Sequence, residues 1–295
     1  MPHYFILENV TALQDGDAKS NNANMVAKML RGLGYKVLVL IQSASSYALP
    51  QRRERILFIG ERISKKGDSI LCALEDLLKS IAASATIPIT KFLSHTHRHS
   101  TNLKKRKYTS VDVGAKWVGV NSKFYKEQNF PWKKNWAKPL DLPAWCRPFI
   151  CESFWDLQAR QKSNALYCFS FFSKPNVRKD FNLTGDSIVL ADLNCSLPWC
   201  VGSVGIFESP CVTTKSIICV VHPYVEVLDL RVSANLMGMD ADAMPNMGVV
   251  ARRHLTTMIG DSFVLPMIGY VMYGIVTLAR VLPKSREESD LLSQE

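Results

Sequence analysis

The chain has 295 residues, of which 47% are hydrophobic and 21% are charged, and its formal net charge is +10. This composition excludes a disordered or collagen-like chain, and the length allows one large domain or two smaller ones. The eight cysteines include no CxxC pair, which argues against a zinc knuckle or a dithiol motif and predicts reduced thiols in an intracellular protein.

Three apolar runs in the first 62 residues predict strands at 4–7, 36–41 and 55–60. A helix is predicted between the first two, from a cap at Asn24 to Leu33, with Met25, Met29 and Leu33 on one apolar stripe. Strand, helix and strand at this spacing favour a right-handed βαβ unit in a parallel sheet. A second amphipathic helix is predicted at 69–82.

From about residue 85 to 222, prolines, aromatics and basic residues replace the periodic pattern, which predicts a loop-rich insert. Between Arg98 and Lys138, eleven Lys or Arg face two acidic residues, a net charge of +9 on an otherwise nearly neutral chain. Such a segment indicates a polyanionic partner, most simply nucleic acid. The imidazoles of His95, His97 and His99 have no evident fourth ligand, so we interpret them as a polar loop and predict no metal site.

An uncharged run extends from Ser262 to Ala279 and is almost long enough to span a membrane. Pro266, Gly269 and Gly274 interrupt it, and there is no second run of this kind, so we predict a helix packed on the sheet. A membrane-anchored protein is the least favoured alternative. The charged residues 284–295 are predicted to form a frayed tail.

Two short motifs lie beside predicted strands, 43 residues apart when counted from Glu8 to Gln51: Phe5-Ile-Leu-Glu8-Asn9-Val10 and Tyr47-Ala-Leu-Pro50-Gln51-Arg52-Arg53-Glu54-Arg55. In order and spacing they resemble the FxxENV and (Y)G(V/I)PQxRxR boxes of the DNA (cytosine-5) methyltransferases. Met258-Ile-Gly260-Asp261-Ser262 resembles the closing GNSV box of that family. Residues 210–213 and 236–239 resemble, more loosely, the stretch before the closing box. Two departures are Ala48, where the family has Gly, and Asp261, where it has Asn.

The resemblance implies methyl transfer from S-adenosylmethionine to C5 of a cytosine flipped out of double-stranded DNA. In this family a cysteine thiolate adds to C6 of the base to form an enamine. Glu8 would then act at N3 and the exocyclic amine, while Arg53 and Arg55 hold the O2 side. Because alternate residues of a strand share a face, the QxRxR spacing is predicted to aim both guanidiniums into one pocket.

Other site residues follow from the same resemblance. Asn9 and Gln51 are structural members of their boxes, and Asp261 and Ser262 match positions near S-adenosylmethionine. The basic insert matches the target-recognition region, where phosphate contacts are predicted for Lys104, Lys105, Arg106, Lys107, Lys133 and Lys134. The run 104–107 also resembles a nuclear localisation signal, so a nuclear or other intracellular location is expected. The interleaved aromatic residues are interpreted as core rather than as base-stacking platforms.

The family's glycine-rich cofactor loop and its Pro-Cys nucleophile both precede the ENV box. Only seven residues precede Glu8 here, and none is Cys or Gly. The sequence therefore predicts a chain that is inactive by itself. Three interpretations remain open: a fragment of a longer enzyme, one subunit of a split methyltransferase whose second chain supplies those boxes, or a non-catalytic DNA-binding remnant.

The predicted fold is α/β, a partial Rossmann-like S-adenosylmethionine-dependent methyltransferase sheet with a loop-rich basic insert. In chain order, the predicted parts are the C-terminal half of the catalytic domain at 1–84, the insert at 85–222, the closing motifs and returning helix at 223–283, and the tail at 284–295.

Overall fold

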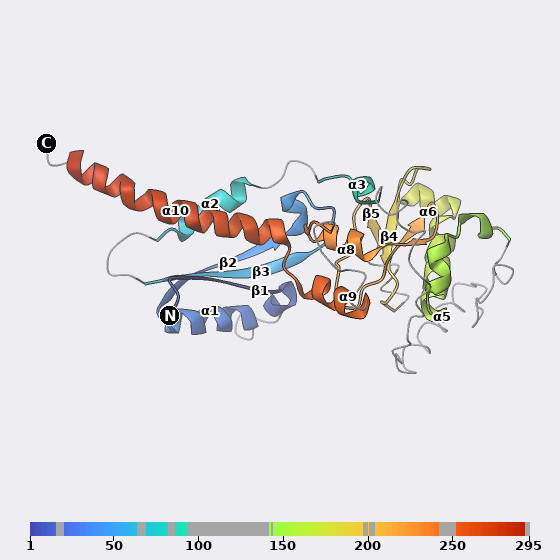
Figure 1. Ribbon diagram of the computed structural model, residues 1–295, viewed down its shortest axis with the longest axis horizontal. Helices are drawn as coiled ribbons and strands as arrows, with labels where there is room; N and C mark the ends of the chain where they lie inside the picture. The colour runs from blue at the N-terminus through green and yellow to red at the C-terminus, as the bar shows by residue number, and fades with distance from the viewer. Residues whose placement is uncertain are drawn as a thin grey trace. The chain divides into compact units, whose positions relative to one another are not determined.

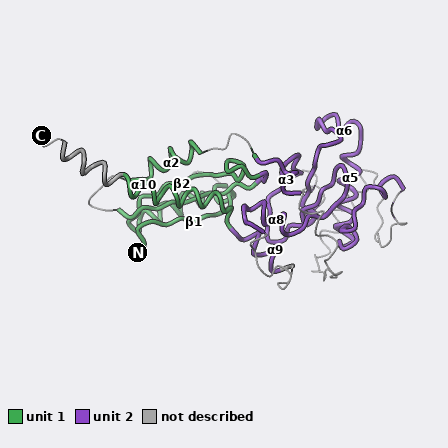
Figure 2. The backbone as a smooth tube through the Cα atoms, turned by 45° about the horizontal axis from the view of Figure 1, so that its top comes forward, with its two compact units in different colours: residues 1–49, 53–86, 263–295 green, residues 50–52, 87–262 purple. Residues whose placement is uncertain are grey.

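The computed structural model describes residues 1–15, 21–63, 69–81, 86–93, 142, 144–196, 200, 204–241 and 252–292 (Figure 1). The chain divides into two compact units (Figure 2). Unit 1 contains residues 1–49, 53–86 and 263–295, and unit 2 contains residues 50–52 and 87–262. Each unit is therefore assembled from segments that are distant in the sequence. The predicted domain boundaries at 84/85 and 222/223 stay predictions.

Unit 1 is built on a three-stranded sheet with the order β1-β3-β2. Its strands are β1 (Tyr4–Val10), β2 (Tyr35–Ser43) and β3 (Glu54–Arg62), and both neighbouring pairs are antiparallel. The three predicted strands are confirmed, and β1 and β2, joined by α1, run in the same direction because each is antiparallel to β3. The predicted parallel sheet is wrong, since β3 lies between β1 and β2. The sequence does not predict this order, because an apolar run carries no information about which neighbour it pairs with.

Helices cover both faces of this sheet, with α1 (Asn22–Gly32) on one side and α2 (Leu71–Ser80) and α10 (Leu265–Leu292) on the other (Figure 1). The centre of the core is β3, where residues 56–59 are at most 1% exposed. Short 3-10 turns follow β1 and β2, η1 (Thr11–Gln14) and η2 (Ala44–Tyr47). The α/β class predicted from the sequence is confirmed.

Helix α1 differs from its prediction in cap and in orientation. Its N-cap is Asn21, whose side chain accepts a hydrogen bond from the Asn24 backbone N–H at 3.2 Å. The buried face is formed by Ala23 and Ala27, which pack on β3. The predicted stripe of Met25, Met29 and Leu33 faces outward, at 56%, 64% and 58% exposure. Small alanines let the helix approach the sheet closely, so tertiary packing overrides the simple apolar-stripe rule.

One helical stretch in the described part of the chain, His254–Val281, is long and apolar enough to cross a membrane by length and composition alone. The core helix of a soluble protein has the same length and composition. Within α10, Val271 is fully buried, and a Cβ atom at Gly274 would meet the Leu74 and Leu77 side chains of α2. One face of α10 is thus packed closely on α2.

Unit 2 contains a four-stranded antiparallel sheet with the order β5-β4-β6-β7. Its strands are β4 (Val189–Asp192), β5 (Gly205–Ile206), β6 (Ile218–His222) and β7 (Glu226–Val227). The helices are α3 (Ile89–Leu93), α5 (Ala159–Phe172), α6 (Pro175–Asp180), α8 (Leu230–Leu236) and α9 (Arg252–Asp261), with 3-10 turns η6 (Arg147–Phe149) and η7 (Glu152–Asp156). This unit has more regular structure than the loop-rich insert predicted from the sequence.

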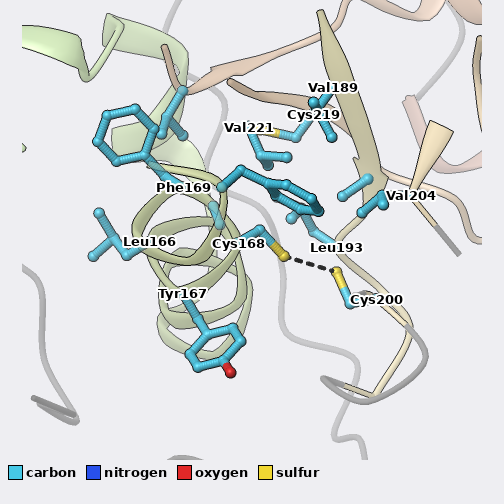
Figure 3. Close-up of a cluster of buried hydrophobic side chains, with 14 of the residues drawn as sticks. Leu166, Tyr167, Cys168, Phe169, Val189, Leu193, Cys200, Val204, Cys219 and Val221 are labelled. Carbon is cyan, nitrogen blue, oxygen red and sulfur yellow. Dashed lines mark hydrogen bonds between the residues drawn. The ribbon is translucent and has the colours of Figure 1, made fainter. Parts of the chain in front are cut away.

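The core of unit 2 forms where α5 packs on β4 and β6 (Figure 3). The Sγ atoms of Cys168 and Cys200 are 3.7 Å apart in this core. The side-chain amide of Asn164 donates to the carbonyls of Leu193 and Cys195, both at 3.1 Å, so the buried polar groups of α5 have partners. Helix α5 is therefore fixed by apolar contacts and by a polar anchor.

Candidate functional site

The strongest candidate site in unit 1 is an ion pair between the two motif strands. Glu8 lies opposite Leu57 and Val10 lies opposite Arg55 in the β1–β3 register, so Glu8 and Arg55 are diagonal neighbours on one face of the sheet. Arg55 Nε is 2.8 Å from Glu8 Oε1, and the two side chains are only 12% and 16% exposed. Two residues that were predicted to share one site are thus in direct contact.

Arg53 lies just before β3, which begins at Glu54. Its side chain is 2% exposed, and its carbonyl accepts a hydrogen bond from Ala44 N at 2.9 Å. This bond continues the β2–β3 pairing one residue before the start of β3, and the predicted sharing of one pocket by Arg53 and Arg55 stays a prediction. Arg53 is a deeply buried charge of the motif, whereas Arg55 remains partly accessible.

The second motif contains a residue with an unusual backbone conformation near its start. Ala48 has φ +65° and ψ +6°, in the left-handed region that favours glycine. The resembled family has Gly at this position, and Ala48 adopts a backbone conformation that suits glycine better than alanine. The adjacent Tyr47 donates from its hydroxyl to Gln42 Oε1 at 2.8 Å, and burial raises the pKa of Tyr47 to about 12.

Gln51 and Arg52 belong to unit 2, where they anchor the second motif. Arg52 N donates to Ser209 O at 2.8 Å, Ser209 N donates to Pro50 O at 2.7 Å, and the Arg52 guanidinium pairs with the Glu208 carboxylate. Gln51 is fully buried and its Nε2 donates to Leu236 O at 3.4 Å. The structural role predicted for Gln51 stays a prediction, and no sequence pattern singles out Ser209 or Glu208.

The closing motif contacts another of the loosely resembling stretches. A Cβ atom at Gly260 would overlap the backbone of Thr213 and Thr214, so only glycine allows this approach. Segments 50–52, 209–214, 236–237 and 260 are thus linked within unit 2 by close packing and main-chain hydrogen bonds. One segment of the second defining motif is thus in contact with the stretches that resemble the family more loosely.

Asp261 and Ser262 lie at the end of α9 in unit 2. Asp261 is exposed, and the Ser262 hydroxyl donates to Ile259 O at 2.6 Å.

The predicted DNA-contacting residues Lys104–Lys107, Lys133 and Lys134 lie outside the described residues, as do His95, His97 and His99. Asn9 is exposed at the end of β1, and its Oδ1 accepts from Val10 N at 2.8 Å.

The cysteines in the unit 2 core are packed rather than poised for nucleophilic attack. Burial raises the pKa of the Cys195 thiol to about 12 and raises the pKa of Cys219 well above its usual value. The pKa of Cys200 is also raised, by its hydrogen bond with Cys168 and by burial. Because the thiolate is the nucleophile, these groups behave as small apolar side chains.

Comparison with known proteins gives matches to methyltransferases. A family model described as C-5 cytosine-specific DNA methylase matches residues 1–167. The chain is 38% identical over 61 residues to the type II methyltransferase M.DdeI of Desulfomicrobium norvegicum, covering 20% of this chain and 15% of that protein. It is 41% identical over 59 residues to M.BsuFI of Bacillus subtilis, covering 20% and 14%. The matched segments thus span less than a sixth of the length of these two relatives.

Two solved structures align over most of the chain. The Dnmt2 methyltransferase of S. pombe is 14% identical with a TM-score of 0.43, covering 92% of this chain and 64% of that one. A putative DNA modification methyltransferase encoded within an E. coli prophage is 16% identical with a TM-score of 0.46, covering 95% and 70%.

The family match covers more than half of the chain and includes both motifs that meet at the Glu8–Arg55 ion pair. The resemblance predicted from those motifs is confirmed at the level of the family. The chain belongs to the C-5 cytosine-specific DNA methylase family.

Proposed function

We propose that this chain forms the cytosine-binding and DNA-binding part of a DNA (cytosine-5) methyltransferase. The observation that carries the proposal is the Glu8–Arg55 pair, which joins the two defining motifs across β1 and β3. A flipped cytosine presents a ring nitrogen and an exocyclic amine along one edge. A carboxyl group can share a proton with N3 and accept a hydrogen bond from the amine, which lowers the barrier to attack at C6.

Arg55 would have a positioning role, because its guanidinium holds the Glu8 carboxylate at 2.8 Å. A rigid carboxylate loses less conformational freedom when the base binds. Arg53, at the O2 side, would stabilise the charge that develops on the pyrimidine when the thiolate adds. Glu8 and Arg53 would thus contact the base, and Arg55 would position Glu8.

S-adenosylmethionine would supply the methyl group when bound. The exposed Asp261 carboxylate suits hydroxyl or ammonium groups of this cofactor. Ser262 suits an acceptor role, because its hydroxyl hydrogen is directed to Ile259 O. These two residues fit one end of such a molecule. The rest of the pocket, including the glycine-rich loop, would come from the polypeptide that also carries the Pro-Cys pair.

The proposed function predicts that the 295-residue chain alone transfers no methyl groups. Transfer of labelled methyl from S-adenosylmethionine to duplex DNA should appear when a polypeptide with the Pro-Cys and glycine-rich boxes is added. In that mixture Glu8→Gln should lower the rate by about 10²-fold or more, the scale expected for a general acid–base group. Glu54→Gln is the matched control, since Glu54 is exposed beside the pair, and its rate should not change. Methyl transfer by the isolated chain, or an active Glu8→Gln variant, would contradict the proposal.

A second candidate function is a non-catalytic DNA-binding protein of intracellular, in particular nuclear, location. The net charge of +9 between Arg98 and Lys138 favours it, because phosphate contacts alone give affinity for a duplex. The two candidates share the DNA partner and differ in chemistry. Retained DNA binding without methyl transfer in the supplemented mixture supports the second candidate.

A further inference from the structure

Two aromatic side chains of unit 2 are exposed on one short segment, residues 144–150, which includes η6. Trp145 is 48% exposed and Phe149 is 45% exposed. Single exposed apolar side chains are common on protein surfaces, whereas apolar side chains exposed close together mark surfaces that bind a partner. The segment is therefore a candidate binding surface.

The two exposed rings contact the same buried ring, Phe169 of α5, which is 3% exposed and lies in the unit 2 core (Figure 3). The Trp145 indole is stacked on Phe169, with ring centroids 5.8 Å apart and an angle of 4° between the planes. The Phe149 ring is tilted by 40° to Phe169, with centroids 5.5 Å apart. Because Phe169 covers one face of the indole, the opposite face of Trp145 points away from the core. The segment thus presents a flat aromatic surface outward.

The backbone that carries the two rings is held in place by the core and by hydrogen bonds. Cys146 is fully buried, and its carbonyl accepts a hydrogen bond from Phe149 N at 3.0 Å. Val225 N donates to Phe149 O at 2.8 Å, and Cys151 N donates to Val225 O at 3.0 Å. A surface that is already ordered loses little conformational entropy when a ligand binds. The two rings are therefore preorganised for binding.

The charge around the rings indicates the kind of partner. Arg147 lies between the two rings in the sequence, is exposed, and is the only charged residue from 142 to 151. Its Nε donates to Leu142 O at 2.9 Å, which keeps the guanidinium beside the segment. The basic segment 98–138, with its net charge of +9, ends seven residues before Trp145. A proline-rich peptide also binds aromatic surfaces, but it gains nothing from this positive charge. A nucleic acid strand offers both phosphates and flat bases.

We propose that Trp145 and Phe149 form a platform on which unpaired nucleobases of a single-stranded nucleic acid stack. Stacking of a base on an aromatic ring tolerates any sequence, because every base has a flat π face. In an intact duplex the neighbouring bases cover those faces, so this surface selects single strands over duplexes. Arg147 and the basic segment contribute phosphate contacts. The inference goes beyond the proposed function, because it requires neither a flipped cytosine nor methyl transfer.

The test compares two strands of equal charge that bind the full 295-residue chain. One is a strand of about 20 thymidines, longer than the site of a typical single-strand-binding module, and the other has the same backbone without bases. Fluorescence anisotropy should show that the thymidine strand binds at least about tenfold more tightly, because stacking on even one ring is worth that much.

Trp145→Ala and Phe149→Ala should each weaken binding of the thymidine strand about tenfold and leave binding of the base-free strand unchanged. Trp145→Tyr keeps an aromatic ring and should keep most of the affinity. Phe207→Ala is the matched control, because Phe207 is an aromatic residue of unit 2 that is 51% exposed outside this segment, and both affinities should stay the same. Equal urea midpoints would verify that the variants fold.

A strand that carries bromodeoxyuridine should, under ultraviolet light, form a cross-link to the peptide that contains Trp145 or Phe149. Equal affinity of the unchanged chain for the two strands would overturn the inference, and this comparison needs no variant. Unchanged thymidine binding in both alanine variants, or cross-links confined to other peptides, would overturn it as well. Binding of a proline-rich peptide that Trp145→Ala abolishes, without a preference for the thymidine strand, would assign the two rings to a peptide instead.

Discussion

At the residue scale, Ala48 occupies a backbone conformation that costs a non-glycine residue about 1 kcal/mol, with φ +65°. Ala48→Gly should therefore raise the free energy of unfolding by up to about 1 kcal/mol, reduced by the greater freedom of glycine in the unfolded chain. The urea midpoint measures the change. Ala44→Gly is the control: Ala44 is fully buried and lacks a positive φ, so the same substitution should destabilise. A loss of stability in Ala48→Gly would show that the Ala48 methyl group has a packing role.

His222 ends β6 and is 5% exposed. Burial lowers the pKa of His222 below its usual value, and nearby Arg178 lowers it further, while the neighbouring Thr184 backbone acts in the opposite direction. Because the unfolded chain then binds a proton more readily than the folded one, stability is present above about pH 6.5 and is lost as pH falls through the folded pKa. Urea unfolding from pH 7.5 to 5 should show this loss, and His222→Leu should flatten it. The exposed His254, changed to Gln, should leave the slope as it is.

At the element scale, the centre of the unit 1 sheet depends on one glycine. Gly60 lies opposite Phe5 in the β1–β3 register, and a Cβ atom at Gly60 would overlap the Phe5 ring. That ring packs edge-to-face with Tyr35 at 4.9 Å, which fixes its position. A residue without a side chain is therefore required at position 60 of β3, because the Phe5 ring of the ENV strand lies against it.

Gly60→Ala should lower the free energy of unfolding by about 1–3 kcal/mol, the usual cost of overpacking. Combining it with Phe5→Leu should recover part of this loss, because the smaller side chain makes room, and the double-mutant cycle measures the coupling. Gly32→Ala is the control, since nothing lies within 4 Å of a Cβ atom there and alanine favours helix. Equal changes in the free energy of unfolding for Gly60→Ala and Gly32→Ala would contradict the steric role of Gly60.

At the scale of the whole molecule, the excess positive charge and the motif residues occupy different parts of the sequence. Nine of the ten excess positive charges lie between Arg98 and Lys138, whereas the two defining motifs lie within residues 5–55. A chain of this kind can gain affinity for DNA from one segment and specificity for a base from another.

The affinity for duplex DNA should fall steeply with salt because each neutralised phosphate releases a counterion. Replacing Lys104, Lys105, Arg106 and Lys107 by Ala should reduce the slope of log affinity against log salt by about 3 to 4, if all four contact phosphate. Lys28→Ala with Lys36→Ala, two exposed cations of unit 1, should leave the slope unchanged. Fluorescence anisotropy at 50–200 mM salt measures the affinity and therefore the slope. An unchanged slope in the quadruple variant would show that residues 104–107 do not contact the DNA.

Apolar runs and short boxes are local features, and they are enough to predict the three strands of unit 1, the helix at 71–80 and the family. They do not predict that β3 lies between β1 and β2, or that Ala23 and Ala27, rather than Met25 and Met29, face the sheet. They also do not predict that Gln51 contacts Leu236 in unit 2 while Arg55 pairs with Glu8 in unit 1. Periodicity indicates which residues prefer to be buried, whereas strand order and partner choice are set by long-range packing that no local pattern encodes.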